Sequence, residues 1–447
     1  MRRPFLYVDP NKEQSLLLLN HTSGSSHLYA SNGLNYAVQE AEAVNKVVIG
    51  HSCICDCNGK KADWLETPDD VLSCVADRLV DVGDIIRFGA VCASWRPIYI
   101  EKRTSRQLAA TPQQIPMLLS ADFNDNRNTR SLYSITEKRV LDFQVCVPHN
   151  LYCLGSSRGW LVTVSKDFKI CLLNPLMAVN NEIVLPPLTS FYTADSNRNL
   201  AKPYTWGFYA FLQKVVLSAN PASNPNFIAL AIYGTVSGLA YFKLGMKAWT
   251  ILPFKYRVIL DIVYYENKFY AVSGNGPVYI LDFNGMYPKM SELVVPMVES
   301  LALKRYLVES SGDLLQVLRY TDWDDMDEDD MDGDDMENYF NVGFDVFKLD
   351  RIGNNWNKVA TLNGHALFLG LSTSLSVLAS DFPGCKPNSI YYTDDYTEAW
   401  NWKATECAEH LLHDIGMFNI EDGTIEQHYP TESKKRSPAP IWIEPTL

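Results

Sequence analysis

Three short stretches of the sequence contain residue types that could carry out chemistry, and the first is "GSSRG" at 155–159. It fits G-x-S-x-G, the nucleophile elbow of hydrolases, in which a sharp turn between a strand and a helix lifts the serine toward an oxyanion hole. Here the strand-like segments "LYCL" and "WLVTV" stand on either side. The sequence therefore favours a hairpin turn over a catalytic Ser157.

The second stretch is a cysteine cluster, because Cys53, Cys55 and Cys57 form C-x-C-x-C and could bind a soft metal ion. Zinc sites more often combine C-x₂₋₄-C with a second, distant pair, and no such pair follows. Several other cysteines lie inside apolar runs, where a thiol behaves as a small hydrophobic group. We therefore expect exposed thiols in a loop, without a metal, a cofactor or a disulfide framework.

The third stretch is acidic: residues 322–337 contain eleven Asp and Glu residues and no Lys or Arg. If Gly333 took the invariant glycine position of a calcium-binding loop, the twelfth position would be Tyr339 instead of the required Glu. Like charges at this density cannot pack against one another. We expect a solvated, disordered loop at 322–338 between adjacent strands, with only weak, nonspecific attraction for cations.

The acidic stretch also accounts for most of the net charge. The chain carries −13 and this stretch −11, which leaves −2 for the other residues. Because a body so near neutrality has no basic face for a phosphate backbone, we expect no nucleic acid partner. No apolar run approaches the roughly 18–20 residues that span a bilayer, and Leu16–Leu19 is too short for a signal peptide. We expect no membrane partner and a location in the cytoplasm, the nucleus or both.

The elements that would position these residues are mostly strands, in a chain of 447 residues that can bury a large core. From about Leu118 onward one pattern recurs: an alternating strand, a polar turn, and a second strand that often closes on Leu-Pro or Trp. Its six copies, about 40 or about 70 residues apart, span 131–148, 169–187, 240–254, 278–296, 344–362 and 415–430. This spacing predicts a β-propeller of about six blades over 118–445, with loops of unequal length.

One segment near the front differs, because "LETPDDVLSCVADRLVDVGDIIRFGAVCASWRP" at 65–97 has the spacing of short amphipathic helices. Thr67 can cap the first helix, Pro68 suits its first turn, and the two following Asp residues favour the positive end of its dipole. We predict a helical module at 61–103, preceded by a poorly ordered extension at 1–60. The predicted fold class is therefore mainly β with a small α module.

The helical pattern alone leaves two explanations open. Two short helices cannot close a core of their own with about 35 residues. In the first explanation, they pack as a hairpin against the propeller. In the second, another protein completes them, as when an amphipathic helix enters a groove on its partner.

The helical module resembles an F-box. The family pattern is Leu-Pro, spaced aliphatic residues and a closing Val-Cys-x-x-Trp-Arg, and here Pro68 and the closing "VCASWR" at 91–96 fit it. The rest of the chain resembles a plant family in which an F-box precedes a propeller-like domain of the KIB type. The matching stretches include "GSSRGWLVTV", "KFYAVSGNGPVYILD" and "PNSIYYTDD". The resemblance extends from about Trp64 to Pro445 and is specific because both halves occur together.

The resemblance implies a substrate receptor of an SCF-type (Skp-cullin-F-box) ubiquitin ligase. In such a complex the F-box binds a Skp-type adaptor, and through it a cullin, while the propeller binds the target protein. Catalysis would occur on other subunits, so the chain itself would not be an enzyme. The residues assigned to adaptor binding are Pro68, Leu72, Val75, Leu79, Ile85, Phe88, Val91 and Trp95.

Two residues depart from the F-box pattern. Thr67 stands where the family usually has Leu, and Pro97 directly follows the closing Trp-Arg, where it should end or kink the last helix. Because both changes would weaken adaptor binding, a second hypothesis stays open: a protein-binding propeller outside any ligase, with a lapsed F-box. A hydrolase that uses Ser157 is the third hypothesis.

Target binding is expected at exposed aromatic residues and arginines near turns, since these types are enriched at interface hot spots. The candidates are Arg158, Trp160, Trp206 and Trp400. Trp206 is favoured among them because Pro203 and Gly207 flank it in a loop-like segment.

Overall fold

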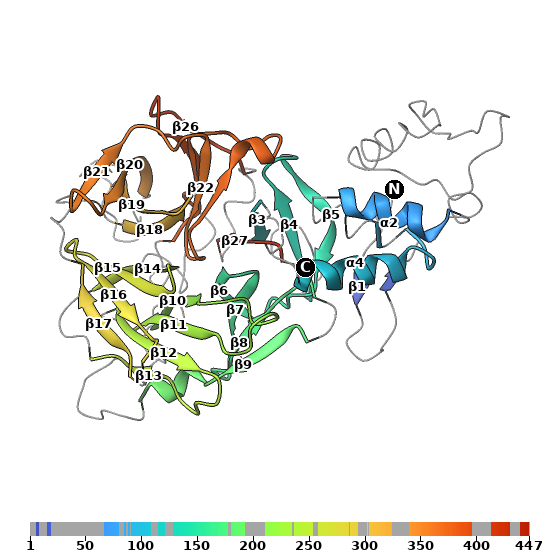
Figure 1. The fold of residues 1–447 in the computed structure, drawn as a ribbon, viewed down its shortest axis with the longest axis horizontal. Helices are drawn as coiled ribbons and strands as arrows, with labels where there is room; N and C mark the ends of the chain where they lie inside the picture. The colour runs from blue at the N-terminus through green and yellow to red at the C-terminus, as the bar shows by residue number, and fades with distance from the viewer. Residues whose placement is uncertain are drawn as a thin grey trace, which may run out of the picture. The chain divides into compact units, whose positions relative to one another are not determined.

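A computed structural model of the chain shows two compact units, drawn in Figure 1. The smaller unit contains residues 1–114, 141–143 and 445–447, and the larger one contains residues 115–140 and 144–444. The structure describes residues 6–8, 16–18, 67–79, 85, 88–89, 91–108, 115–120, 128–177, 180–192, 211–234, 237–253, 258–285, 287–293, 302, 304–323, 339–395, 413–429 and 439–446.

The larger unit is a β-propeller of six sheets, or blades, which confirms the predicted architecture. In sheet order, blade 1 contains β27 (Ile441–Ile443), β3 (Met117–Ser120), β4 (Arg130–Ser134) and β5 (Arg139–Val145). Blade 2 contains β6 (Tyr152–Ser157), β7 (Trp160–Val164), β8 (Ile170–Leu173) and β9 (Glu182–Leu185). Blade 3 contains β10 (Leu212–Leu217), β11 (Ile228–Tyr233), β12 (Gly238–Lys243) and β13 (Thr250–Ile251). A short 3₁₀ helix, Leu188–Tyr192, follows β9.

Blades 4 to 6 continue the same arrangement, and blade 6 has a fifth strand. Blade 4 contains β14 (Ile259–Tyr265), β15 (Lys268–Ser273), β16 (Val278–Asp282) and β17 (Lys289–Glu292). Blade 5 contains β18 (Lys304–Ser310), β19 (Asp313–Trp323), β20 (Tyr339–Asp350) and β21 (Asn355–Val359). Blade 6 contains β23 (Leu375–Leu378), β22 (His365–Leu369), β24 (Ser389–Tyr392), β25 (Gly416–Asn419) and β26 (Ile425–Glu426).

The repeated sequence pattern corresponds to the two outer strands of each blade. The copy at 169–187 supplies β8 and β9, and the copy at 344–362 supplies most of β20 and all of β21. Each such pair is antiparallel and is joined by a turn. The pattern recurs because every blade presents the same outer hairpin.

Two strands depart from chain order. β27, near the C-terminus, pairs with β3 and closes the ring in blade 1. β23 pairs with β22, and β22 runs parallel to β24. The repeated sequence pattern does not predict either pairing, because each depends on which strands become neighbours when the ring closes.

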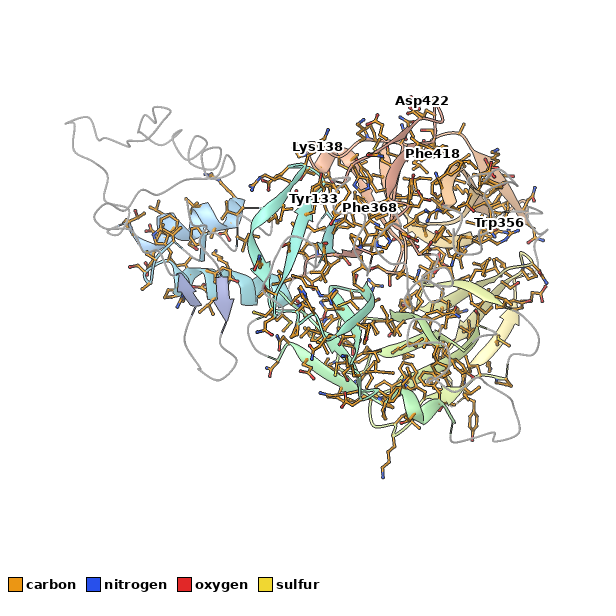
Figure 2. The ribbon with its side chains drawn as sticks, turned by 180° about the vertical axis from the view of Figure 1, so that it is seen from behind. Tyr133, Lys138, Trp356, Phe368, Phe418 and Asp422 are labelled. Carbon is orange, nitrogen blue, oxygen red and sulfur yellow. The ribbon has the colours of Figure 1, made fainter. Side chains whose placement is uncertain are left out.

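The propeller core lies between neighbouring blades. Clusters of buried apolar side chains join blades 2 and 3, 3 and 4, 4 and 5, 5 and 6, and 6 and 1. In Figure 2, Phe368 and Phe418 lie among such side chains, whereas the exposed Lys138 and Asp422 lie at the edge of the unit. Because inner strands are covered on both faces, they are nearly continuous apolar runs instead of alternating ones.

The two ends of each blade differ in their connections. On one face, which we call the turn face, the first two strands of blades 2, 4 and 5 are joined by tight turns such as Arg158–Gly159 and Glu266–Asn267. On the other, the connection face, the second strand of these blades leads to the third, and blades 1 to 4 each lead to the next blade. In blade 5, for example, Lys304 at the start of β18 pairs with Arg319 near the end of β19. The connection that enters this blade and the connection from its second to its third strand therefore lie at the same end. The strand ends on this face flank 193–210, 324–338 and 396–412.

Among the described residues, the smaller unit contains two helices, α2 (Asp69–Arg78) and α4 (Arg96–Leu108). Asp69 and Asp70 lie in the first turn of α2, as the dipole argument predicts. Lys102 of α4 forms a 2.7 Å ion pair with Asp77 of α2. Among the described residues, no helix is both long enough and apolar enough to cross a membrane.

Both helix starts correct a prediction. The N-cap of α2 is Pro68, whose carbonyl accepts 3.1 Å hydrogen bonds from the N–H groups of Val71 and Leu72, so the prediction that Thr67 caps this helix is wrong. Pro97 lies in the first turn of α4, so the prediction that it ends or kinks a helix is also wrong. First-turn N–H groups have no acceptor within the helix, and a proline there removes no hydrogen bond.

Described strands also fall inside two predicted ranges, the extension at 1–60 and the acidic loop at 322–338. In the N-terminal extension, β1 (Leu6–Val8) and β2 (Leu16–Leu18) pair as antiparallel strands. Asp322 and Trp323, predicted to begin the acidic loop, belong to β19 and pair with β20. Residues 324–338, like the Cys53–Cys57 cluster, lie outside the described residues.

Candidate functional site

The residues predicted to bind an adaptor divide into a buried and an accessible group. Six side chains are at most 5% exposed: Leu72, Val75, Leu79, Ile85, Phe88 and Trp95. The rings of Phe88 and Trp95 lie 4.7 Å apart, and a Cβ on Gly89 would collide with the ring of Tyr99. These side chains serve the fold of the helical module, and a partner cannot reach them while the module stays closed.

The accessible part of the module is smaller. Pro68 is exposed and Val91 is partly exposed. Val71, on α2, is 43% exposed although it lies in the same apolar run as the buried Leu72. The sequence pattern includes Val71 but does not distinguish it from its buried neighbours, because helical spacing alone does not show which side of the stripe faces out.

The axis of the propeller is filled by the chain itself. Residues 371–374 leave β22 and cross to other blades before β23 begins. The N–H of Thr373 donates to the carbonyl of Ser156 on β6 at 2.8 Å, and the Ser372 hydroxyl donates to the carbonyl of Trp442 on β27 at 2.6 Å. We call 371–374 the axial segment.

A buried ion pair lies beside the axial segment. Lys214 on β10 and Asp261 on β14 are 2.5 Å apart, and both follow β-bulges, which redirect side chains. Asp261 also accepts a 2.8 Å hydrogen bond from the N–H of Leu307 and a 3.5 Å one from the Ser374 hydroxyl. Burial raises the pKa of Asp261, and Lys214 acts against that shift. These contacts fasten blades 3, 4 and 5 to the axial segment.

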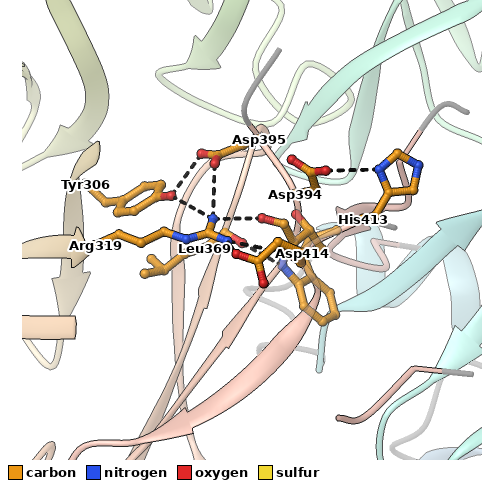
Figure 3. Close-up of polar contacts among 9 residues, drawn as sticks. Tyr306, Arg319, Leu369, Asp394, Asp395, His413 and Asp414 are labelled. Atoms are coloured by element: carbon orange, nitrogen blue, oxygen red, sulfur yellow. Dashed lines mark hydrogen bonds and ion pairs between the residues drawn. The ribbon is translucent and has the colours of Figure 1, made fainter. Parts of the chain in front are cut away.

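A second buried charge cluster joins blades 5 and 6 and is shown in Figure 3. The Arg319 guanidinium on β19 lies 3.1 Å from the carboxylate of Asp395 and 2.8 Å from that of Asp414. The Tyr306 hydroxyl donates to Asp395 at 2.9 Å. Burial by itself would lower the pKa of Arg319, but Tyr306, Asp414 and Asp395 hold it well above the ordinary value. Burial, followed by the Asp395 charge, raises the pKa of Tyr306.

This cluster holds the base of one connection. Asp394 and Asp395 directly precede 396–412, and His413 and Asp414 directly follow it. Nδ1 of His413 lies 3.0 Å from the Asp394 carboxylate, and Arg319 contacts both Asp395 and Asp414, so two sets of polar contacts link the start and the end of the connection. The sequence predictions missed this arrangement. The sequence feature that could have indicated it is the pair of acids, Asp394 and Asp395, shortly after the apolar strand β24.

Two of the predicted target-binding residues lie outside the described residues. Trp206 belongs to the connection between β9 and β10, and Trp400 to the connection between β24 and β25. The strand ends that flank them lie on the connection face. Their role in target binding stays a prediction.

The other two candidates have opposite outcomes. Arg158 is exposed on the turn face; burial raises the pKa of Glu444 and of Tyr264, and the positive charge of Arg158 acts against both shifts. Trp160 is only 1% exposed, and its indole N–H donates to the Asn220 side chain at 3.0 Å. The prediction that Trp160 contacts a target is therefore wrong, because this side chain fills the core between blades 2 and 3.

Ser157 lies in a hairpin, as its flanks predict. It pairs with Trp160 across the Arg158–Gly159 turn, whose two residues both have positive φ, the pattern of a tight hairpin turn. The Ser157 hydroxyl is buried and accepts a 3.0 Å hydrogen bond from the N–H of Leu217. Strands on both sides replace the strand-turn-helix geometry that the nucleophile elbow requires.

The described residues also bear on metal binding. Within them, no group of three or more His, Cys, Asp or Glu side chains is placed to hold a metal ion. The buried acids instead face cationic partners, as Asp261 faces Lys214 and Asp395 faces Arg319.

Comparison with known proteins places these features in context. Residues 132–419 match the family model described as the KIB1-4 beta-propeller. The F-box protein SKIP23 of Arabidopsis thaliana is 26% identical over 407 residues, covering 85% of this chain and 95% of that protein. A second, putative F-box protein of the same plant is 28% identical and covers 74% of this chain and 86% of its own length.

Solved structures give a weaker likeness. The β-propeller domain of Cps50 (Swd1) from Myceliophteria thermophila is 12% identical, with a TM-score of 0.30, and covers 70% of this chain and 85% of that one. At that score the similarity carries no argument about function.

Proposed function

Because this chain belongs to the KIB1-4 β-propeller family, whose F-box relatives match it along most of their length, we propose that it is the substrate-receptor subunit of an SCF-type ubiquitin ligase. The helical module would bind a Skp-type adaptor and, through it, a cullin. The propeller would bind the target protein. The chain would act without chemistry of its own, in the cytoplasm, the nucleus or both.

One observation carries this proposal: the residues of the F-box pattern form a folded helical module ahead of the family's propeller. Leu72 and Val75 on α2, and Phe88 and Trp95 before α4, are all buried. An F-box that had lost its function would not be expected to keep its core residues, since loss of selection permits core substitutions that destabilise by several kcal/mol.

The second hypothesis, a propeller with a lapsed F-box, loses one of its two supports. Pro97 begins α4 instead of breaking a helix, so it does not disturb the module. Thr67 remains a departure from the family pattern, and it lies at the accessible end of α2 beside Pro68. Adaptor affinity, and not the fold of the module, is therefore the quantity to measure.

The test is direct binding between the full chain and a purified plant Skp-type adaptor, measured by biolayer interferometry. The exposed Val71 should lie in the contact, so Val71→Asp should weaken binding at least tenfold, which is about 1.4 kcal/mol or more. The helical circular dichroism should be unchanged, because this side chain is 43% exposed.

The matched control is Ile352→Asp, since Ile352 is fully exposed in the turn between β20 and β21 of the propeller. It adds the same charge without touching the module and should leave the adaptor affinity unchanged. If the unmodified chain does not bind the adaptor at micromolar concentration, the ligase proposal fails and the lapsed F-box remains.

A further inference from the structure

The outermost strands of three consecutive blades differ at one position. Trp249, directly before β13 of blade 3, is 4% exposed and belongs to the apolar cluster shared with blade 2. Trp356, which pairs with Leu349 in blade 5, is 6% exposed and belongs to the cluster shared with blade 4. The corresponding residue of blade 4 is Met290, which pairs with Leu281 in the same way but is 40% exposed. The junction of blades 3 and 4 therefore lacks the buried indole of the two neighbouring junctions.

Apolar side chains near Met290 remain accessible at this junction. The partly buried Tyr241 of blade 3 contacts Phe283 of blade 4, with ring centroids 5.0 Å apart. Leu244, directly after β12, is 60% exposed, and Tyr287, in the turn between β16 and β17, is 74% exposed. We define the 3–4 junction as the residues Tyr241, Leu244, Phe283, Tyr287 and Met290. A group of exposed apolar side chains of this kind is typical of a surface that a partner covers.

Two lysines border the 3–4 junction. The Lys243 ammonium lies 5.3 Å from the centroid of the Phe283 ring, and Lys247 is exposed in the turn between β12 and β13. Among the described residues, neither lysine forms an ion pair with a carboxylate. Glu292 lies on the same side of β17 as Met290, but at the end of that strand away from the turn face. The end of the junction on the turn face therefore carries positive charge that a partner can neutralise.

The outermost strands of blades 2 and 6 provide a comparison. Val184 on β9 is 58% exposed and Ile425 on β26 is 44% exposed, so an accessible apolar side chain is not unique to blade 4. In both of these blades, however, a glutamate of the same strand already pairs with a lysine, at 2.8 Å in blade 2 and 2.6 Å in blade 6. These pairs are Lys169–Glu182 and Lys386–Glu426. Of the three positions, the 3–4 junction alone combines exposed apolar side chains with lysines that have no acidic partner among the described residues.

We propose that the 3–4 junction binds a segment of the target protein in which an aromatic residue stands beside Asp or Glu. The inference rests on the proposed function, since it names the kind of segment that the receptor holds. The aromatic side chain takes the place that Trp249 and Trp356 take at the neighbouring junctions, and the carboxylates pair with Lys243 and Lys247. Burial of the aromatic ring supplies affinity, and the charges supply selectivity.

A second copy of this chain is a less favourable occupant. In a dimer with two-fold symmetry the same surface patch of both subunits meets itself. Such a dimer would bring Lys243 and Lys247 of one subunit toward the same lysines of the other, and like charges across an interface oppose association. The charge of the junction therefore favours an acidic partner.

The experiment uses the full chain and a fluorescein-labelled peptide, Asp-Glu-Gly-Trp-Gly-Ser, with binding measured by fluorescence anisotropy. One matched peptide has Ser in place of Trp, and another has Lys-Lys in place of Asp-Glu. We expect saturable binding of the first peptide, and binding at least tenfold weaker for each of the other two.

Two variants of the chain locate the binding site. Met290→Trp should fill the junction from within, so it should weaken peptide binding at least tenfold without lowering the melting temperature. Its matched control is Ile425→Trp, which adds the same side chain to an outermost strand of similar exposure and should leave peptide binding unchanged. Lys243→Glu combined with Lys247→Glu should reverse the preference, so that the Lys-Lys peptide binds more tightly than the Asp-Glu peptide.

The proposal is overturned if the Asp-Glu peptide does not bind saturably, if its Ser counterpart binds equally, or if the double lysine variant keeps the original preference. A dimer in sedimentation velocity that Met290→Trp dissociates would assign the junction to a second copy and would also overturn it. Adaptor binding by all of these variants should equal that of the unaltered chain. A failure of this inference is therefore distinguishable from a failure of the ligase proposal.

Discussion

In the helical module the residues of the family pattern are themselves the core, whereas in the propeller the predicted binding residues other than Trp160 lie outside the strands that form the core. Leu72 and Trp95 carry the F-box pattern and are buried. In the propeller the buried residues belong to the repeated blades, and Trp206 and Trp400 belong to connections between strands. A core substitution should therefore remove function and fold together in the module, but not in the propeller.

The same difference explains how each region is held together. The module has two described helices, joined by a few buried side chains and the exposed Lys102–Asp77 pair. The propeller has apolar clusters between blades and, in addition, buried ion pairs that cross from one blade to the next. Substitutions in each region test whether stability and recognition separate in this way.

The largest effect is expected at Arg319 in the propeller. Arg319→Met would leave the carboxylates of Asp395 and Asp414 buried without their cation, at a cost of about 3–5 kcal/mol. The urea concentration at the midpoint of propeller unfolding should be clearly lower than in the unaltered chain. The control is Lys348→Met, which removes an exposed pair with Asp313 at 2.6 Å and should cost less than about 1 kcal/mol.

A triple variant sharpens the interpretation of that result. Combining Arg319→Met with Asp395→Asn and Asp414→Asn removes the uncompensated charges and should recover part of the lost stability, because unpaired buried charge is the main cost. If the triple variant is no more stable than Arg319→Met, packing and not charge holds blades 5 and 6 together at this cluster.

The next effect is expected in the module. Trp95→Ala removes a ring that is 3% exposed and contacts Phe88, at a cost of about 3 kcal/mol or more. Such a small core cannot absorb that loss, so adaptor binding should fall at least tenfold while the propeller unfolds as before. Leu79→Ala should behave alike, and Cys74→Ser, at an exposed position of α2, should change neither property.

A loss of propeller stability in Trp95→Ala would contradict the comparison, because it would mean that the module and the propeller share one folding transition. Separate transitions in differential scanning calorimetry, only one of which shifts, would support it.

The sequence predicted those features that repeat locally. The outer hairpin of each blade has the same pattern, so the number of blades and the fold class were accessible from the sequence. Ser157 was assigned to a turn because the strands on both sides of it are adjacent in sequence. The buried F-box positions were accessible as well, since helical spacing selects them.

Features that depend on distant partners could not be predicted in this way. Trp160 was expected at the surface, but its indole N–H meets Asn220 from the next blade. The role of Arg319 depends on acids from blade 6, and the closing strand β27 depends on β3. Thr67 and Pro97 were misjudged for a local reason, because the exact start of a helix is set by its first-turn hydrogen bonds.

A moderate effect is expected at Gly155, which meets the axial segment. Its φ of +138° disfavours any other residue, and a Cβ there would lie 2.7 Å from the carbonyl oxygen of Leu371. Gly155→Ala should destabilise the propeller by about 1–3 kcal/mol. Gly423→Ala is the control for backbone strain alone, because Gly423 also has positive φ, at +74°, but no atom within 4 Å of the added Cβ.

The difference in destabilisation between Gly155→Ala and Gly423→Ala measures how firmly the axial segment is held in place. Equal destabilisation in thermal melts would mean that the axial segment moves aside at no cost. The axis would then be accessible, and the propeller would no longer differ from the module in keeping its binding residues away from its core.

The smallest effect is expected from removing the acidic sequence of the connection between β19 and β20. Because Trp323 and Tyr339 pair directly, a hairpin needs at least two residues between them, so Asp324–Glu337 should be replaced by a six-residue Gly-Ser linker. Loop-closure entropy changes slowly with length, and removing like charges relieves repulsion, so stability should change by less than about 1 kcal/mol. Adaptor binding should not change. A large fall in the melting temperature would instead show that this acidic sequence is part of the propeller's structure, and recognition would then be coupled to folding in the propeller as it is in the module.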